Sequence, residues 1–139
     1  RESIVSKAEA KGIHAIDIIV EQATRQQVPL FLSLSNWSVF FIKDAYSKKA
    51  SSPTKQGEIM AMGIPIVCND IGDTGRIVNE SGAGIVTPSF DIQNLQIISQ
   101  KIIENNGYDK ERLREAAINY YNLTRGVQVY KIVYGKIKF

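Results

Sequence analysis

Apolar and polar positions repeat with two different periods along the chain, and these periods predict a series of helices and strands. Residues 2–11 place Ile4, Val5 and Ala8 at helical spacing before Gly12, which predicts a first helix. Short β-branched or apolar runs predict four buried strands at residues 16–20, 38–42, 65–68 and 84–87.

Helical patterns lie between these strands and after the last one. Residues 28–34, 55–62 and 76–80 predict connecting helices, and Gly63 follows the second of them as a stop signal. The last third of the chain has apolar residues only at helical spacing. It predicts three helices that begin near Asp91, Asp109 and Thr124, the last two residues acting as N-caps.

Strands that alternate with helices are typical of an α/β fold. We expect a Rossmann-like parallel sheet with helices on both faces, right-handed crossovers and a helical C-terminal third. Ligands bind to such sheets at the carboxyl ends of the strands. This rule indicates two loops, residues 43–54 after the second predicted strand and residues 69–75 after the third.

Composition narrows the chemistry that the chain can perform. Its 139 residues predict one domain, 1–139, and the single cysteine excludes an internal disulfide and a paired-cysteine zinc site. The single histidine argues against a histidine-rich metal site or a Ser-His-Asp triad. We interpret His14 as structural and Cys68 as a small buried apolar residue. The net charge of +3 suits an anionic ligand or an anionic membrane surface, and it does not indicate nucleic acid.

The first residue of the chain and its most apolar stretch indicate whether it is part of a larger protein and where in the cell it is expected. The sequence begins with Arg1 rather than methionine, so we expect a piece of a larger protein. The apolar stretch 28–42 is interrupted by serine and asparagine and is shorter than the roughly 20 residues that a membrane-spanning helix needs. We expect a cytoplasmic protein, with peripheral contact at the inner face of the membrane as a further possibility.

The loop before the helix at 55–62 carries the candidate chemistry. Hydroxyl side chains before a helix leave backbone N–H groups free to face a phosphate. The carboxylate of Glu58, one turn inside the helix, can accept two hydrogen bonds from a ribose diol. A solvated basic loop with Glu58 as an ordinary surface acid is the competing interpretation. The candidate phosphate contacts are Ser51, Ser52, Thr54 and Lys55, and Lys48 and Lys49 add positive charge.

Four motifs in order resemble one enzyme family. Residues 58–67, EIMAMGIPIV, resemble the E-x-x-A-x-G-x-P-V-[IV] signature of retaining GT-B glycosyltransferases, known as family 4 or group 1. Residues 72–78 are similar to its G-G-x-x-E-[IL]-[IV] segment and residues 84–88 to its G-x-L-V-x-P segment. Residues 130–134 resemble its aromatic C-terminal helix. Each piece is a weak signal, and their order makes the resemblance specific.

The resemblance implies the donor-binding half of a two-domain enzyme, without its first strands. The enzyme would transfer a sugar from a UDP or GDP sugar to a bacterial surface glycan, retaining anomeric configuration and using no metal or other cofactor. Glu58 would contact the ribose, and residues 51–55 the diphosphate. Gly72, Asp73 and Thr74 would lie beside the donor. The fragment holds no certain catalytic residue and would be inactive without its N-terminal acceptor domain.

This sequence departs from the family pattern at three positions. The first of the paired glutamates is replaced by Ala50, so its donor-sugar contact is lost or taken over by Lys48 or Lys49. Asp73 replaces a loop glycine, and Arg76 replaces an acidic residue.

Two other functions stay open. A non-catalytic nucleotide- or anion-binding α/β module and a GT-B-like sugar-nucleotide epimerase domain would use the same architecture. The missing strands would expose a sheet edge, so we expect unusual pairing of the strand at 16–20 or a homodimer through that edge. Lys131, Lys136 and Lys138 form a basic C-terminal segment, which is either a solvated face or a membrane contact.

Overall fold

The computed structural model describes residues 2–50, 52–104 and 107–137. Its contacts divide the chain into two compact units, residues 1–31 and residues 32–139. The elements, in order, are α1 (Glu2–Glu9), the 3₁₀ turn η1 (Ala15–Asp17), α2 (Val28–Ser33), β1 (Ser38–Val39), α3 (Tyr46–Lys49), α4 (Thr54–Ala61), β2 (Ile66–Asn69), α5 (Thr74–Ser81), β3 (Gly84–Thr87), α6 (Ile92–Glu104), α7 (Lys110–Tyr121) and α8 (Leu123–Lys136).

The first unit contains α1 and η1 but no strand among its described residues, so the strand predicted at 16–20 is wrong. Ile16 is 89% exposed and Ile19 is 84% exposed. A buried strand needs a neighbouring strand for its backbone groups and apolar side chains on its faces. None of residues 4–31 is buried, so this apolar run has neither.

The second unit contains a parallel three-stranded sheet in the order β1-β2-β3, which confirms the α/β fold class. Ile66 of β2 lies opposite Ser38 of β1 and Gly84 of β3. An ideal Cβ at Gly84 would lie 1.8 Å from the Ile66 carbonyl oxygen, so only glycine lets β3 approach β2 this closely.

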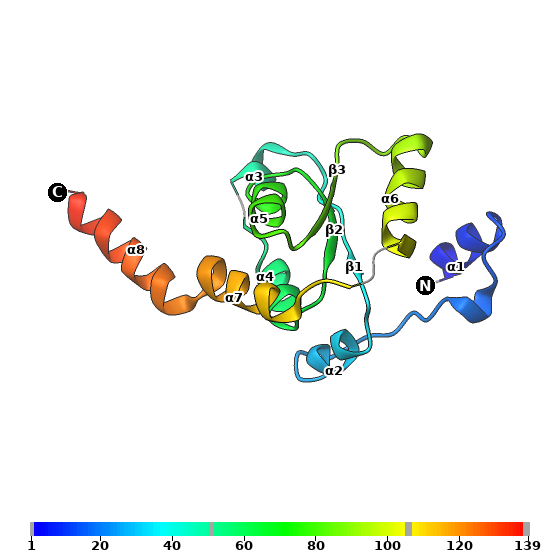
Figure 1. Cartoon of the computed structure of the whole chain (residues 1–139), viewed down its shortest axis with the longest axis horizontal. Coiled ribbons are helices and arrows are strands. Elements are labelled where there is room, and N and C mark those ends of the chain that lie inside the picture. The colour runs from blue at the N-terminus through cyan, green and yellow to red at the C-terminus, as the bar shows by residue number, and fades with distance from the viewer. Residues whose placement is uncertain (1, 51, 105–106, 138–139) are drawn as a thin grey trace. The chain divides into compact units, whose positions relative to one another are not determined.

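Helices cover both faces of the sheet, as predicted. Figure 1 shows α4 and α5 on one side of the strands and α6 on the other. Ile66 and Cys68 of β2 belong to the core cluster formed with α4, α5 and α7. Alternate residues of a strand point to opposite faces, so Val67, which is also buried, lies on the face that α6 covers.

Local signals placed most helix ends correctly. Gly63 follows α4 with a φ of +71°, a conformation that glycine adopts without strain. The Asp109 carboxylate accepts hydrogen bonds from the N–H groups of Glu111 and Arg112, which confirms it as the N-cap of α7. The cap of α8 is a correction: Asn122, rather than Thr124, is the N-cap, and its side chain accepts from the Thr124 N–H.

Candidate functional site

The loops after β1 and β2 are tied together at the carboxyl edge of the sheet. Asn69, the last residue of β2, accepts a hydrogen bond from the Ile42 N–H and donates one to the Ile42 carbonyl, both at 2.8 Å. The Asn69 side-chain amide therefore bonds both the N–H and the carbonyl of Ile42, as the backbone of a neighbouring strand would do. This contact fixes the start of the loop that leads through α3 to α4, next to the loop that leads to α5.

Three predicted site residues share the exposed side of α4. Thr54, Lys55 and Glu58 are exposed, whereas Gln56 and Ile59 are buried on the other side of the helix. Thr54 and Glu58 are four residues apart, so they are neighbours on the helix surface. Glu58 is exposed, so its carboxylate is accessible to a ligand from solvent.

The remaining predicted residues of this loop lie on and after α3. Lys48 and Lys49 are exposed in α3, and Lys49 Nζ lies 3.3 Å from Asp44 Oδ1. Lys49, a candidate for the donor-sugar contact, is thus paired with Asp44 in this structure. Ser52 is exposed, and Ser51 lies outside the described residues.

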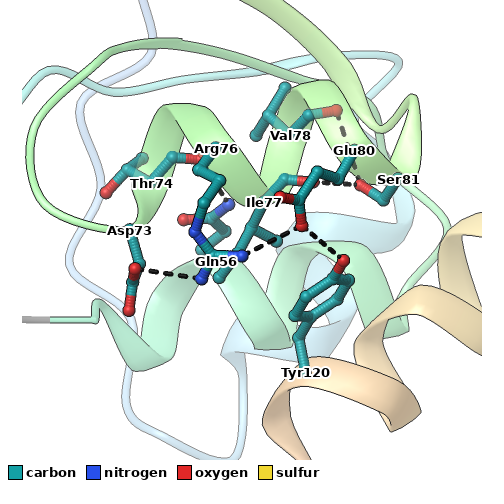
Figure 2. Close-up of polar contacts among 9 residues, drawn as sticks. All are labelled: Gln56, Asp73, Thr74, Arg76, Ile77, Val78, Glu80, Ser81 and Tyr120. Carbon is teal, nitrogen blue, oxygen red and sulfur yellow. Dashed lines mark hydrogen bonds and ion pairs between the residues drawn. The ribbon is translucent and has the colours of Figure 1, made fainter.

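The loop after β2 brings its predicted residues against the first turn of α4. Gly72 has a φ of +62°, and Asp73 is the N-cap residue of α5. Thr74 is fully buried, and its carbonyl accepts a hydrogen bond from Gln56 Nε2 at 3.1 Å. Figure 2 shows Gln56 beside the start of α5, where this bond joins the N-terminal turns of α4 and α5.

Two buried polar atoms at this junction have no hydrogen-bond partner among the described residues: Gln56 Oε1 and Thr74 Oγ1. The Tyr121 ring packs over Gly57, where an ideal Cβ would lie 2.5 Å from Tyr121 Cγ. Buried polar groups are normally paired, because an unpaired one loses its hydrogen bonds to water. Gln56 is not among the predicted site residues; its signal in the sequence is a polar residue on the apolar side of α4.

Arg76 is held by two carboxylates on the surface of α5. Its guanidinium lies 3.0 Å from Asp73 Oδ1 and 2.9 Å from Glu80 Oε2 (Figure 2). These bonds raise the pKa of Arg76, Asp73 being the main cause. The Tyr120 hydroxyl donates to Glu80 at 2.8 Å, and that bond, with Arg76, lowers the pKa of the Glu80 carboxyl. In this structure the Arg76 guanidinium therefore forms ion pairs only with carboxylates at the start and on the surface of α5.

Cys68 is buried in β2, as predicted. Burial, with a smaller effect from the charge of Asp70, raises the pKa of its thiol from 9.0 to about 12. An ideal Cβ at Gly75 would lie 2.3 Å from Asp70 Oδ1, so this carboxylate packs against the first turn of α5. The positive end of α5 thus already has an anion beside it. The N-terminus of α4, where Pro53 supplies no side-chain cap, is the better candidate for a phosphate.

A cavity of about 690 Å³ lies at the opposite edge of the sheet. Trp37 and Tyr108 both line this cavity. Their rings pack edge to face, with centroids 5.1 Å apart. None of the predicted site residues lines it.

The described residues contain no group of three or more histidine, cysteine, aspartate or glutamate side chains arranged to hold a metal ion. They also include no helix with the length and apolar character needed to cross a bilayer. Comparison of the chain with protein-family models, curated proteins and solved structures gives no match.

Proposed function

We propose that the chain binds a nucleoside-diphosphate sugar at the carboxyl edge of its sheet, as the donor half of a retaining glycosyltransferase. One observation carries this proposal. The exposed face of α4 presents Thr54, Lys55 and Glu58 beside a junction where buried Gln56 and Thr74 each keep an unpartnered oxygen. The order of the four sequence motifs supports the choice of a sugar nucleotide among phosphate-bearing ligands.

Each residue of the site has a role in this proposal. Glu58 accepts hydrogen bonds from the two ribose hydroxyls, and the first turn of α4, with Lys55, holds the diphosphate. Ser51 and Ser52 extend that contact, and Gly72 and Asp73 line the donor from the other loop. Lys48 and Lys49 face the donor sugar, which for Lys49 requires release of Asp44.

The proposed setting follows from the resemblance. The acceptor is a surface glycan on the cytoplasmic side of a bacterial membrane, and its binding site belongs to an N-terminal half. The purified 139-residue chain is therefore expected to bind donor without transferring sugar, and measurable turnover would contradict the division into two halves.

A non-catalytic nucleotide-binding module is the second candidate, favoured by one observation. Ala50 stands where the family has the first of its paired glutamates, so one donor-sugar contact is missing. If the chain binds a nucleoside diphosphate as tightly as the corresponding nucleotide sugar, the binding module is favoured over the transferase.

Isothermal titration with UDP, GDP and their nucleosides tests the site. Charge-assisted hydrogen bonds contribute about 1.5–3 kcal/mol each. We expect Glu58→Ala to weaken nucleotide binding by roughly ten- to a hundredfold, allowing for water in the vacated space. Lys55→Ala should weaken diphosphates more than nucleosides, because its partner is phosphate.

Glu115→Ala removes an exposed glutamate from α7 and is the matched control; it should bind as the parent does. Folding should be unchanged in all three variants, since none of these side chains is buried. A Glu58→Ala variant that binds the preferred nucleotide as tightly as the parent would leave Glu58 as an ordinary surface acid.

A further inference from the structure

The hydrogen-bond ladder between β1 and β2 continues one residue past the end of β1. The Phe40 N–H donates to the Val67 carbonyl at 3.0 Å. Bonds between parallel strands recur at every second residue. The regular continuation would therefore join the Ile42 N–H to the Asn69 carbonyl, and the Ile71 N–H to the Ile42 carbonyl.

The Asn69 side chain takes the place of these two backbone groups. The Ile71 N–H donates to the Asn69 carbonyl at 3.1 Å, so both groups are used within the turn that ends β2. Asn69 Oδ1 accepts from the Ile42 N–H, and Asn69 Nδ2 donates to the Ile42 carbonyl, each at 2.8 Å. One side-chain amide thus supplies both the acceptor and the donor that the backbone no longer presents.

This replacement matters because little else holds the segment between β1 and α4. None of the described residues 43–50 and 52–55 is buried, so apolar packing contributes little to their placement. Side-chain amides hold the two ends of the segment instead. Asn69 bonds Ile42 at its start, and Gln56 bonds the Thr74 carbonyl at its end. Both anchors join the segment to residues 69–74, which lead into α5.

We propose that Asn69 is a positioning residue of the nucleotide site and raises its affinity without touching the ligand, a role that rests on the proposed function. The Asn69 amide holds the loop that carries Lys48 and Lys49 next to the loop that carries Gly72 and Asp73. A ligand that contacts both loops binds more weakly when one of them must first be ordered.

Two measurements on the full 139-residue chain test this role. Asn69→Ala removes both bonds to Ile42. In isothermal titration with UDP and GDP, we expect this variant to raise the Kd of the better-bound nucleotide by about five- to tenfold. Exchange of the Ile42 amide, followed by NMR without ligand, should become faster in the same variant.

Asn69→Asp separates positioning from a general loss of stability. A carboxylate accepts from the Ile42 N–H but cannot donate to its carbonyl, whereas a neutral carboxyl does both, as the amide does. We expect the Kd of this variant to exceed that of the parent by at least about fivefold at pH 7. The ratio should fall toward one as the pH is lowered to about 4.5, where the carboxyl begins to protonate.

The ratio of variant to parent removes ionisations that the two proteins share. The ligand phosphates titrate in both measurements, as do the charged residues that flank Ile42 and Asn69 in the two loops: Lys43, Asp44, Asp70 and Asp73. Asn79 is an exposed asparagine of α5 and supplies the matched controls. Asn79→Ala and Asn79→Asp should bind nucleotide as the parent does at both pH values and leave exchange at Ile42 unchanged.

The outcomes distinguish this role from the proposed function. If the parent binds nucleotide and folded Asn69→Ala binds it equally well, the positioning role is wrong and the proposed function stands. Unchanged exchange at Ile42 in Asn69→Ala would also overturn the role. A parent that binds neither nucleotide would overturn both. If Asn69→Ala does not fold, Asn69→Asp decides, and a Kd ratio that does not fall in acid contradicts the role.

Discussion

At the scale of single residues, Cys68 makes stability depend on pH in the alkaline range. Its pKa is about 12 in the folded chain and 9.0 in an unfolded one. A raised folded-state pKa contributes stability that is fully present below pH 9 and is lost as the pH rises toward 12. We expect the free energy of urea unfolding to fall less steeply over that range in Cys68→Ala than in the parent.

Lysine and tyrosine also ionise at high pH, so the difference between the two proteins is the quantity to compare. At pH 8 the native thiol should react with Ellman's reagent only as fast as the chain unfolds. Rapid labelling of the folded parent would show that Cys68 is accessible, contrary to its burial.

Thr74 provides a second test at the residue scale. Its buried hydroxyl has no partner among the described residues, so Thr74→Val removes an unpaired polar group while keeping the shape. We expect the free energy of unfolding to increase by about 1 kcal/mol, measured by urea denaturation. If the hydroxyl serves the proposed ligand, nucleotide binding should weaken in the same variant.

Thr87→Val is the control for Thr74→Val. Thr87 is also buried, but its hydroxyl donates to the Ser89 carbonyl. Its loss should destabilise the fold by about 1 kcal/mol. Equal destabilisation by both substitutions would mean that Thr74 is hydrogen-bonded in solution.

At the scale of elements, two helical glycines should respond oppositely to alanine. An ideal Cβ at Gly57 in α4 would lie 2.5 Å from Tyr121 Cγ, whereas one at Gly126 in α8 meets no atom within 4 Å. Gly126→Ala should stabilise the chain by about 0.5–1 kcal/mol through helix propensity. Gly57→Ala should instead destabilise it by about 1–3 kcal/mol, because the Tyr121 ring must move.

Thermal unfolding of the two alanine variants beside the parent measures both effects. A stabilised Gly57→Ala variant would mean that α7 does not pack on α4 as described.

The strand edge at β1 carries a further prediction at this scale. β1 is an outer strand of the sheet and its Val39 side chain is exposed, which favours pairing with a second copy. We expect a concentration-dependent homodimer in sedimentation velocity, and Val39→Lys should dissociate it. A parent chain that stays monomeric at high concentration would contradict the sheet-edge dimer.

At the scale of the whole molecule, the two compact units should differ in protection from hydrogen exchange. The buried apolar core consists of residues between Ile59 and Ala117, and none of residues 4–31 is buried. Amides of β2 should therefore exchange only through global unfolding, whereas those of α1 and η1 should exchange through local opening at much lower cost. Slow exchange throughout the first unit would show that a contact covers it in solution.

The sequence by itself determined the local features whose causes lie within a few residues. Helical spacing with Gly63 placed the end of α4, and Asp109 placed the start of α7. The β-branched run at 84–87 placed β3. Strands that alternate with helices also predicted the parallel sheet and its covered faces. The α4 face with Lys55 and Glu58 was predictable because helix geometry alone places them together, whereas Thr54 was expected in the preceding loop and is the first residue of α4.

Only the tertiary structure decided what depends on a distant partner. The apolar run at 16–20 reads as a strand, but a strand also requires a neighbour, and none of the described residues supplies one. The bond from Gln56 to Thr74 and the Tyr121 ring over Gly57 join residues 18 and 64 positions apart. The exposure of α8 likewise depends on what does not pack against it. Sequence periodicity describes one element at a time, whereas burial and hydrogen-bond partners are properties of elements in contact.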